Sequence, residues 1–184
     1  MIILITGATH TGKTLLAQKL LEERKSPCFS IDHLKMGLIR SGMTTLTPED
    51  DDALTGYLWP IVREMLKTAV ENHQDLIVEG CYVPFDWRKD FGEEYLREIR
   101  FICLSMSDAY VDAHIGEIRA HASDIERRLF EAEESEEFLK TENRKYAEGF
   151  RNAGEPVVLI ETDYEETIGK LVDSFIEWEH PDKE

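Results

Sequence analysis

Two glycines, a lysine and a threonine near the N-terminus have the spacing of a loop that binds phosphate groups. Gly7 and Gly12 are separated by four residues, and Lys13 and Thr14 follow at once. Glycine lets the backbone curl so that successive N–H groups point at phosphate oxygens. Lys13 would then reach the β- and γ-phosphates of a nucleoside triphosphate, and the Thr14 hydroxyl would bind Mg²⁺. We expect ATP and Mg²⁺ as ligands, with nucleotide contacts from Gly7, Thr9, His10, Thr11, Gly12, Lys13, Thr14 and Leu15.

The residues that flank this loop predict the elements that hold it. The apolar run 2–6 predicts a buried strand before the loop, and residues 13–23 predict a helix after it. The unpaired N–H groups at the start of that helix, and the positive end of its dipole, would add to the attraction for phosphate. A ligand-free strand–helix turn is the alternative, but the complete and correctly flanked pattern favours nucleotide binding.

Four further apolar runs predict strands that alternate with helices along the rest of the chain. Short, wholly apolar strands suit a parallel sheet covered on both faces, so we predict an α/β fold with three α/β/α layers and five parallel strands. No linker divides the chain, which predicts a single domain over residues 1–184. The predicted strands are 28–31, 76–78, 101–104 and 157–160, and the predicted helices include 107–122, one that ends near 152 and one that follows Asp163.

Two polar residues are predicted to cap helices at their N-termini. Thr47 precedes Pro48 and two acidic residues, which predicts an N-cap followed by the first helical position. Asp163 is predicted to cap the last helix, with Glu166 as its capping-box partner. These residues therefore set the expected starts of two helices.

Polar residues follow the predicted strands at the edge where ligands of parallel sheets bind. Thr6, Asp32, Glu79, Ser105 and Glu161 all end strands, so we expect them to face one cleft. A carboxylate that closes an apolar strand is rarely core filling, which favours a functional role for Asp32 and Glu79. For Asp32 the alternative is a simple cap on the helix that follows it.

With these elements the chain resembles the small P-loop kinases, the adenylate-kinase-like and zeta-toxin-like enzymes that phosphorylate metabolites or sugar nucleotides. The resemblance implies that Lys13 and Thr14 hold the triphosphate and Mg²⁺, and that Asp32 orients or deprotonates the acceptor. It also implies that Arg40, on the helix after Asp32, grips an anionic group of the acceptor. Glu79 lies in an "apolar, apolar, Glu, Gly" strand ending, so either Asp32 or Glu79 would meet the metal through water, and Glu79 would otherwise bind the acceptor.

The same resemblance implies an arginine-bearing helical lid that closes over ATP. The lid is expected over about 119–138, between core segments 1–118 and 139–184, and its predicted catalytic residues are Arg119 and Arg128. Phosphoryl transfer spreads negative charge over oxygens, and a permanently charged guanidinium stabilises that charge with paired hydrogen bonds.

Composition limits the classes of partner. The net charge of −17 disfavours a broad nucleic-acid surface, and no apolar stretch approaches the length that crosses a bilayer. The three cysteines lack metal-ligand spacing and are odd in number, which predicts reduced thiols and a cytoplasmic protein. The first residues lack a basic leader, so no signal peptide is expected. The oligomeric state stays open.

The sequence thus predicts an ATP-dependent phosphotransferase that moves the γ-phosphoryl group to a small acceptor: a nucleotide, a sugar nucleotide or another metabolite. The motifs do not name the acceptor, and a toxin-type kinase of sugar nucleotides stays open. The alternative of another class is a nucleotide-dependent switch or regulatory ATPase that acts through a protein partner. A GTPase is disfavoured because no Asn-Lys-x-Asp segment is present.

Overall fold

The computed structural model describes residues 1–120 and 135–177. Its five strands form one sheet in the order β2-β3-β1-β4-β5, and every neighbouring pair is parallel. The predicted five-stranded parallel sheet is therefore confirmed. The strands are β1 (Ile2–Gly7), β2 (Cys28–Ser30), β3 (Leu76–Glu79), β4 (Ile99–Met106) and β5 (Val157–Ile160).

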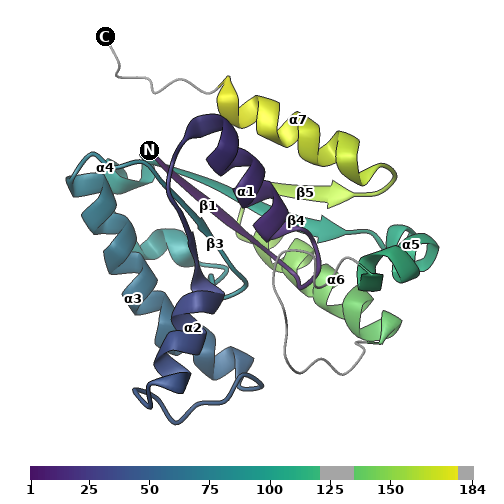
Figure 1. The fold of residues 1–184 in the computed structure, drawn as a ribbon, viewed down its shortest axis with the longest axis horizontal. Coiled ribbons are helices and arrows are strands. Elements are labelled where there is room, and N and C mark those ends of the chain that lie inside the picture. The colour runs from purple at the N-terminus through teal and green to yellow at the C-terminus, as the bar shows by residue number, and fades with distance from the viewer. Residues whose placement is uncertain (121–134, 178–184) are drawn as a thin grey trace.

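Helices cover both faces of the sheet, which gives the predicted three layers (Figure 1). Helices α1 (Lys13–Arg24) and α7 (Tyr164–Ile176) lie side by side over one face. Helices α3 (Asp51–Glu71) and α6 (Glu136–Asn152) cover the other. In residues 1–120 and 135–177 no helix is both long and apolar enough to cross a membrane. The remaining helices are α2 (Ile31–Arg40), α4 (Glu93–Leu96), α5 (Asp108–Ala120) and the 3₁₀ helix η1 (Trp87–Asp90).

Strand β1 shows why its sequence is apolar throughout. Successive side chains of a strand point to opposite faces. Ile3 and Ile5 pack under α1 and α7, whereas Ile2 and Leu4 pack under α3, and all four are at most 1% exposed. Because both faces are covered, β1 has no position for a polar residue before Thr6, and the loop leaves the sheet from its buried centre.

Two predicted boundaries are wrong. The second strand ends at Ser30, where its pairing with Glu79 of β3 stops, so Asp32 lies in the first turn of α2 and does not end a strand. Helix α3 begins at Asp51 after Asp50 as its N-cap, and not at Pro48 after a Thr47 cap. Thr47 donates its N–H and its hydroxyl to the Asp50 carboxylate, at 2.8 and 3.0 Å, so it closes a turn before the helix.

The predicted cap on the last helix is confirmed. The Asp163 carboxylate accepts a hydrogen bond from the Glu166 N–H at 2.8 Å, and α7 begins at the next residue after Asp163. The proposed lid lies mostly outside the described residues, since 121–134 are not described. Its two ends overlap helices, because α5 continues to Ala120 and α6 begins after Ser135. The division into core and lid stays a prediction.

Candidate functional site

The loop between β1 and α1 is fixed by close approaches to the neighbouring strands. The Thr6 hydroxyl donates to the carbonyl oxygen of Gly80 at 2.8 Å, which ties the end of β1 to the end of β3. Gly7 has φ +143°, and a Cβ there would lie 2.0 Å from the carbonyl oxygen of Leu104 in β4. The first glycine of the motif is therefore required by packing as well as by backbone conformation.

The second glycine sets the start of α1. Gly12 is the N-cap and has φ +80°, a left-handed conformation that favours glycine. Gly12 has no side chain with which to cap the first turn of α1. The N–H groups of that turn therefore keep the arrangement that suits a bound phosphate. A Cβ on Gly12 would lie 1.6 Å from the hydroxyl of Tyr164, so the first residue of α7 packs directly against the loop.

Two side chains of the loop converge on one carbonyl oxygen. The Lys13 ammonium donates to the Ala8 carbonyl at 2.6 Å, and the Thr11 hydroxyl donates to the same oxygen at 2.9 Å. Lys13 is only 7% exposed, which is unusual for a lysine. These bonds hold its ammonium against the loop, where the motif requires a cation for the phosphates.

The hydroxyl of Thr14 and the carboxylate of Glu79 meet beside the loop. Thr14 donates to Glu79 Oε2 at 3.4 Å, and Glu79 is only 2% exposed at the end of β3. A hydroxyl and a carboxylate are the oxygen ligands that Mg²⁺ uses when phosphates and water supply the rest. Within the described part of the chain no three His, Cys, Asp or Glu side chains gather as a metal site of their own. The residues therefore fit a magnesium ion that arrives with a nucleotide.

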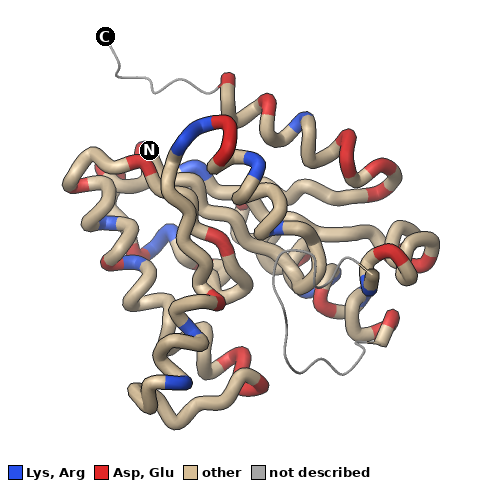
Figure 2. The backbone as a smooth tube through the Cα atoms, in the orientation of Figure 1, with Lys and Arg blue, Asp and Glu red and all other residues tan. Residues whose placement is uncertain are grey.

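Charge along the chain singles out α1 among the helices. The chain carries a net charge of −17, and acidic residues are spread over most of its elements (Figure 2). Each of the other α-helices in the described ranges, α2 to α7, has at least one acidic residue in its first turn, whereas α1 has none. Acidic residues there would repel an anion from the positive end of the helix dipole. Their absence at α1 favours anion binding.

On the other side of the loop, Asp32 belongs to a chain of contacts that links α2 to α3. Asp32 Oδ1 lies 2.6 Å from the Lys35 ammonium, which also donates to the Tyr82 hydroxyl at 2.8 Å. The Tyr82 hydroxyl donates in turn to the Asp51 carboxylate at 3.1 Å. Lys35, Tyr82 and Asp51 are not among the predicted site residues. Lys35 alone had a local signal, because it follows Asp32 by one helical turn.

The segment after β3 brings Cys81 between the loop and Asp32. Burial raises the pKa of the Cys81 thiol, the charges of Asp32 and Glu79 raise it further, and the Lys13 ammonium opposes them. Tyr82 is 4% exposed, and burial followed by the charges of Asp32 and Asp51 raises its pKa. Contacts place these groups together: Thr6 bonds to the Gly80 carbonyl, and a Cβ on Gly80 would lie 2.7 Å from the Cβ of Ile31, the residue before Asp32. The phosphate loop, Glu79 and Asp32 therefore share one region at the carboxyl edge of the sheet.

The predicted arginines are not brought to this region by any described contact. Arg40 is exposed at the last residue of α2, eight residues beyond Asp32 and so about 12 Å further along the helix. Arg119 is exposed in the last turn of α5, and Arg128 lies outside the described residues. Their roles stay predictions.

In the loop, the Thr9 hydroxyl lies 2.9 Å from His10 Nδ1.

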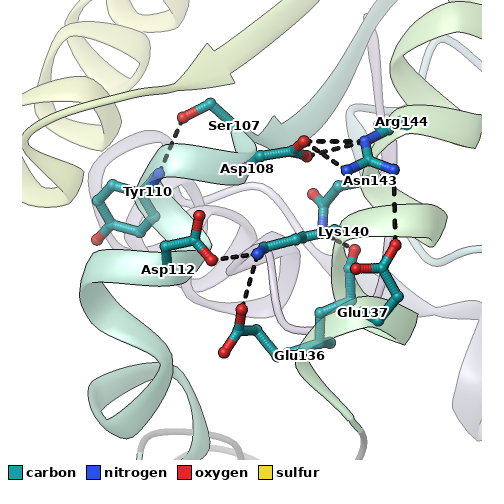
Figure 3. A network of polar contacts seen from close by, with 10 residues as sticks. Ser107, Asp108, Tyr110, Asp112, Glu136, Glu137, Lys140, Asn143 and Arg144 are labelled. Atoms are coloured by element: carbon teal, nitrogen blue, oxygen red, sulfur yellow. Dashed lines mark hydrogen bonds and ion pairs between the residues drawn. The ribbon is translucent and has the colours of Figure 1, made fainter.

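Helix α6 is held against α5 by the polar contacts that Figure 3 shows, and its Asn143 also bonds to Ser105 and Met106 of β4. The Arg144 guanidinium pairs with Asp108 at 2.5 Å, and Lys140 bonds to Asp112 and Glu136. Asn143 is 1% exposed. Ser105, expected in the cleft, is wholly buried and donates to the Asn143 carbonyl at 2.9 Å, so that expectation is wrong. The helices on either side of residues 121–134 thus have a fixed spacing.

Solved structures share this fold, although neither a protein-family model nor a curated protein sequence matches the chain. A shikimate kinase from Acinetobacter baumannii, in complex with shikimate, is similar with a TM-score of 0.57 and 16% identity over 95% of this chain and 92% of that chain. A sugar kinase from Janibacter sp. HTCC2649 has a TM-score of 0.56 and 15% identity, over 94% and 92% of the two chains. A deoxyadenosine kinase from M. mycoides has the same TM-score and identity, over 95% and 98%. The chain therefore has the fold of the P-loop small-molecule kinases, and the predicted resemblance is confirmed for the fold.

Proposed function

We propose that this protein is an ATP-dependent phosphotransferase that moves the γ-phosphoryl group to a small-molecule acceptor. The observation that carries the proposal is the meeting, at one edge of the sheet, of the phosphate loop with Glu79 and Asp32. Lys13 and Thr14 stand on the phosphate side of this region, and the contact chain of Asp32 stands on the other. The likeness in fold to a sugar kinase, a shikimate kinase and a deoxyadenosine kinase supports the same class of reaction.

Each group of residues has a separate role in the proposed phosphoryl transfer. The N–H groups of the loop and the first turn of α1 bind the β- and γ-phosphates, and Lys13 stabilises negative charge on them during transfer. Asp32 orients the acceptor hydroxyl and takes its proton, since one carboxylate oxygen contacts Lys35 and the residue is part-exposed at the start of α2. Mg²⁺, when bound with the nucleotide, supplies charge neutralisation between the phosphates. Thr14 would hold it, with Glu79 behind a bound water.

A screen of ADP release with Mg²⁺ and ATP against hydroxyl- and phosphate-bearing metabolites tests the proposal. We expect one class of acceptor to stimulate ADP release and Lys13→Ala to abolish the stimulation, because the substitution removes the cation that faces the phosphates. Asp32→Asn should lower kcat about 10²–10⁴-fold, the usual contribution of a general base. It should leave the dissociation constant for nucleotide unchanged.

Asp86→Asn provides a matched control for the Asp32 variant. Asp86 is an exposed aspartate that pairs only with Lys89 on the surface among its described contacts. It should therefore keep full turnover. Full phosphotransfer by Asp32→Asn would contradict the role given to Asp32. Nucleotide binding that depends on Lys13, with no acceptor-stimulated turnover, would instead favour the regulatory ATPase.

A further inference from the structure

Among residues 1–120 and 135–177, the acceptor side of the site carries more carboxylates than unpaired ammonium groups. Asp32 and Asp51 flank the Lys35–Tyr82 pair, and Glu79 stands behind the loop. Burial raises the pKa of the Tyr82 hydroxyl, and the charges of Asp32 and Asp51, which contact the Lys35–Tyr82 pair, raise it further. Two carboxylates from two different helices, Asp32 of α2 and Asp51 of α3, therefore lie on the acceptor side, whereas Glu79 lies on the phosphate side beside Thr14.

The ammonium groups of Lys13 and Lys35 already have partners. Lys13 bonds to the Ala8 carbonyl and faces the phosphates of the donor. The side chain of Lys35 is 13% exposed; its ammonium contacts Asp32 and the Tyr82 hydroxyl and lies 4.9 Å above the Tyr82 ring. Such a lysine neutralises one carboxylate and is held by its contacts, so it is not a mobile cation that reaches for a second anion.

The segment of Cys81 and Tyr82, which lies beside these charges, is held in place by hydrogen bonds. The Tyr82 hydroxyl connects Lys35 of α2 with Asp51 of α3, and the Tyr146 hydroxyl of α6 donates to the Cys81 carbonyl at 2.8 Å. The same segment after β3 is thus bonded to three helices. Moving Lys35 toward an acceptor would break its bonds to Asp32 and Tyr82, which would leave two buried or part-buried groups without their partner.

We propose that the acceptor is an uncharged or cationic hydroxyl compound, and not a phosphate monoester or a carboxylate. The inference rests on the proposed phosphotransferase function. An anionic group of the acceptor would lie beside fixed carboxylates, and the like charges would repel each other. The site would therefore discriminate against anionic acceptors. This proposal differs from the expectation that Arg40 binds an anionic group of the acceptor. Arg40 lies at the far end of α2.

Matched acceptor pairs that differ only in charge test this selectivity. We would measure kcat/KM with ATP for glycerol against glycerate, glucose against gluconate, and nucleosides against their 5′-monophosphates, with glucosamine as a cationic sugar. For the pair that contains the substrate, kcat/KM of the neutral or cationic member should exceed that of the anionic member about 100-fold or more. The ratio should fall as salt rises, because screening weakens the repulsion.

Two neighbouring aspartates in α3 provide the variants. Asp51→Asn removes a carboxylate that faces Tyr82, so the ratio of neutral to anionic kcat/KM should fall several-fold. Asp52→Asn makes the same chemical change at a side chain that is fully exposed and 4.0 Å from Lys145, and should leave the ratio unchanged. A wild-type preference for the anionic members would overturn this inference and leave the proposed function intact. Failure to phosphorylate any acceptor, with nucleotide binding intact, would overturn the proposed function and the inference with it.

Discussion

Gly12 is the residue on which the geometry of the phosphate loop depends most. Its φ is +80°, and a Cβ at this position would lie 1.6 Å from the Tyr164 hydroxyl, so there is no room for a side chain. Gly12→Ala should therefore weaken nucleotide binding at least about tenfold, because the loop must shift away from α7 and loses its N–H geometry. Calorimetric titration with ATP and Mg²⁺ measures the loss.

Gly169→Ala is the matched control for that substitution. Gly169 lies within α7, a Cβ there would meet no atom within 4 Å, and its backbone is not left-handed. Alanine favours a helix over glycine by up to about 1 kcal/mol, so this variant should bind nucleotide normally and unfold no earlier than the wild type. Equal nucleotide affinity in both variants would contradict the role given to Gly12.

The phosphate loop could be predicted from the sequence, whereas the contacts around Tyr82 could not. Gly7, Gly12, Lys13 and Thr14 were predictable because the loop closes on itself within a few residues. The contacts of Tyr82 were not, because its partners Lys35 and Asp51 are 47 and 31 residues away in the chain. Only the folded sheet and its helices bring them together.

Among the elements, α6 is joined to the sheet by a buried side chain. Asn143 accepts a hydrogen bond from the Met106 N–H at 2.6 Å through its Oδ1 and donates to the Leu139 carbonyl at 2.8 Å through its Nδ2. Asn143→Ala leaves the buried N–H of Met106 without its partner, so the free energy of unfolding should fall by about 1–3 kcal/mol. Urea denaturation measures the change.

Asn152→Ala offers the comparison within the same helix. Asn152 is exposed at the last residue of α6, so its removal should change the free energy of unfolding by less than about 0.5 kcal/mol. Similar losses in the two variants would show that Asn143 does not fasten the helix.

Element boundaries show where local signals compete. The start of α7 was predictable because one carboxylate, Asp163, caps it without a rival. The start of α3 was not, because Thr47 and Asp50 both favour caps and the carboxylate of Asp50 bonds back to Thr47. The predicted second strand included Ile31, which is instead the first residue of α2. Ile31 is wholly buried, so its apolar side chain resembled that of a buried strand residue.

Across the whole molecule, tyrosines half-buried or buried between elements link stability to alkaline pH. Burial raises the pKa of Tyr164 from 10.0 to about 12, and burial also raises the pKa values of Tyr82 and Tyr146. A raised folded pKa means that the folded state keeps a proton that the unfolded state loses above pH 10. The stabilisation is therefore complete below about pH 10 and is lost as pH rises toward 12 and beyond.

We expect the free energy of unfolding to fall above pH 10 and Tyr164→Phe to reduce the slope. Phenylalanine fills the same place beside the loop but cannot ionise. Tyr57→Phe, at an exposed position on α3, should keep the wild-type slope. Urea midpoints measured at a series of alkaline pH values give the comparison. The same slope in the two variants would show that Tyr164 is not the linked group.

The transfer of the phosphoryl group itself is the measurement that tests the central proposal most directly. ATP labelled with heavy oxygen in its γ-phosphoryl group would be incubated with Mg²⁺, the protein and each acceptor of the panel. The masses of the products would then be measured by mass spectrometry. Our account predicts an acceptor that gains one labelled phosphoryl group, with wild-type protein and not with Lys13→Ala. Label that appears only in inorganic phosphate, for every acceptor offered, would contradict it.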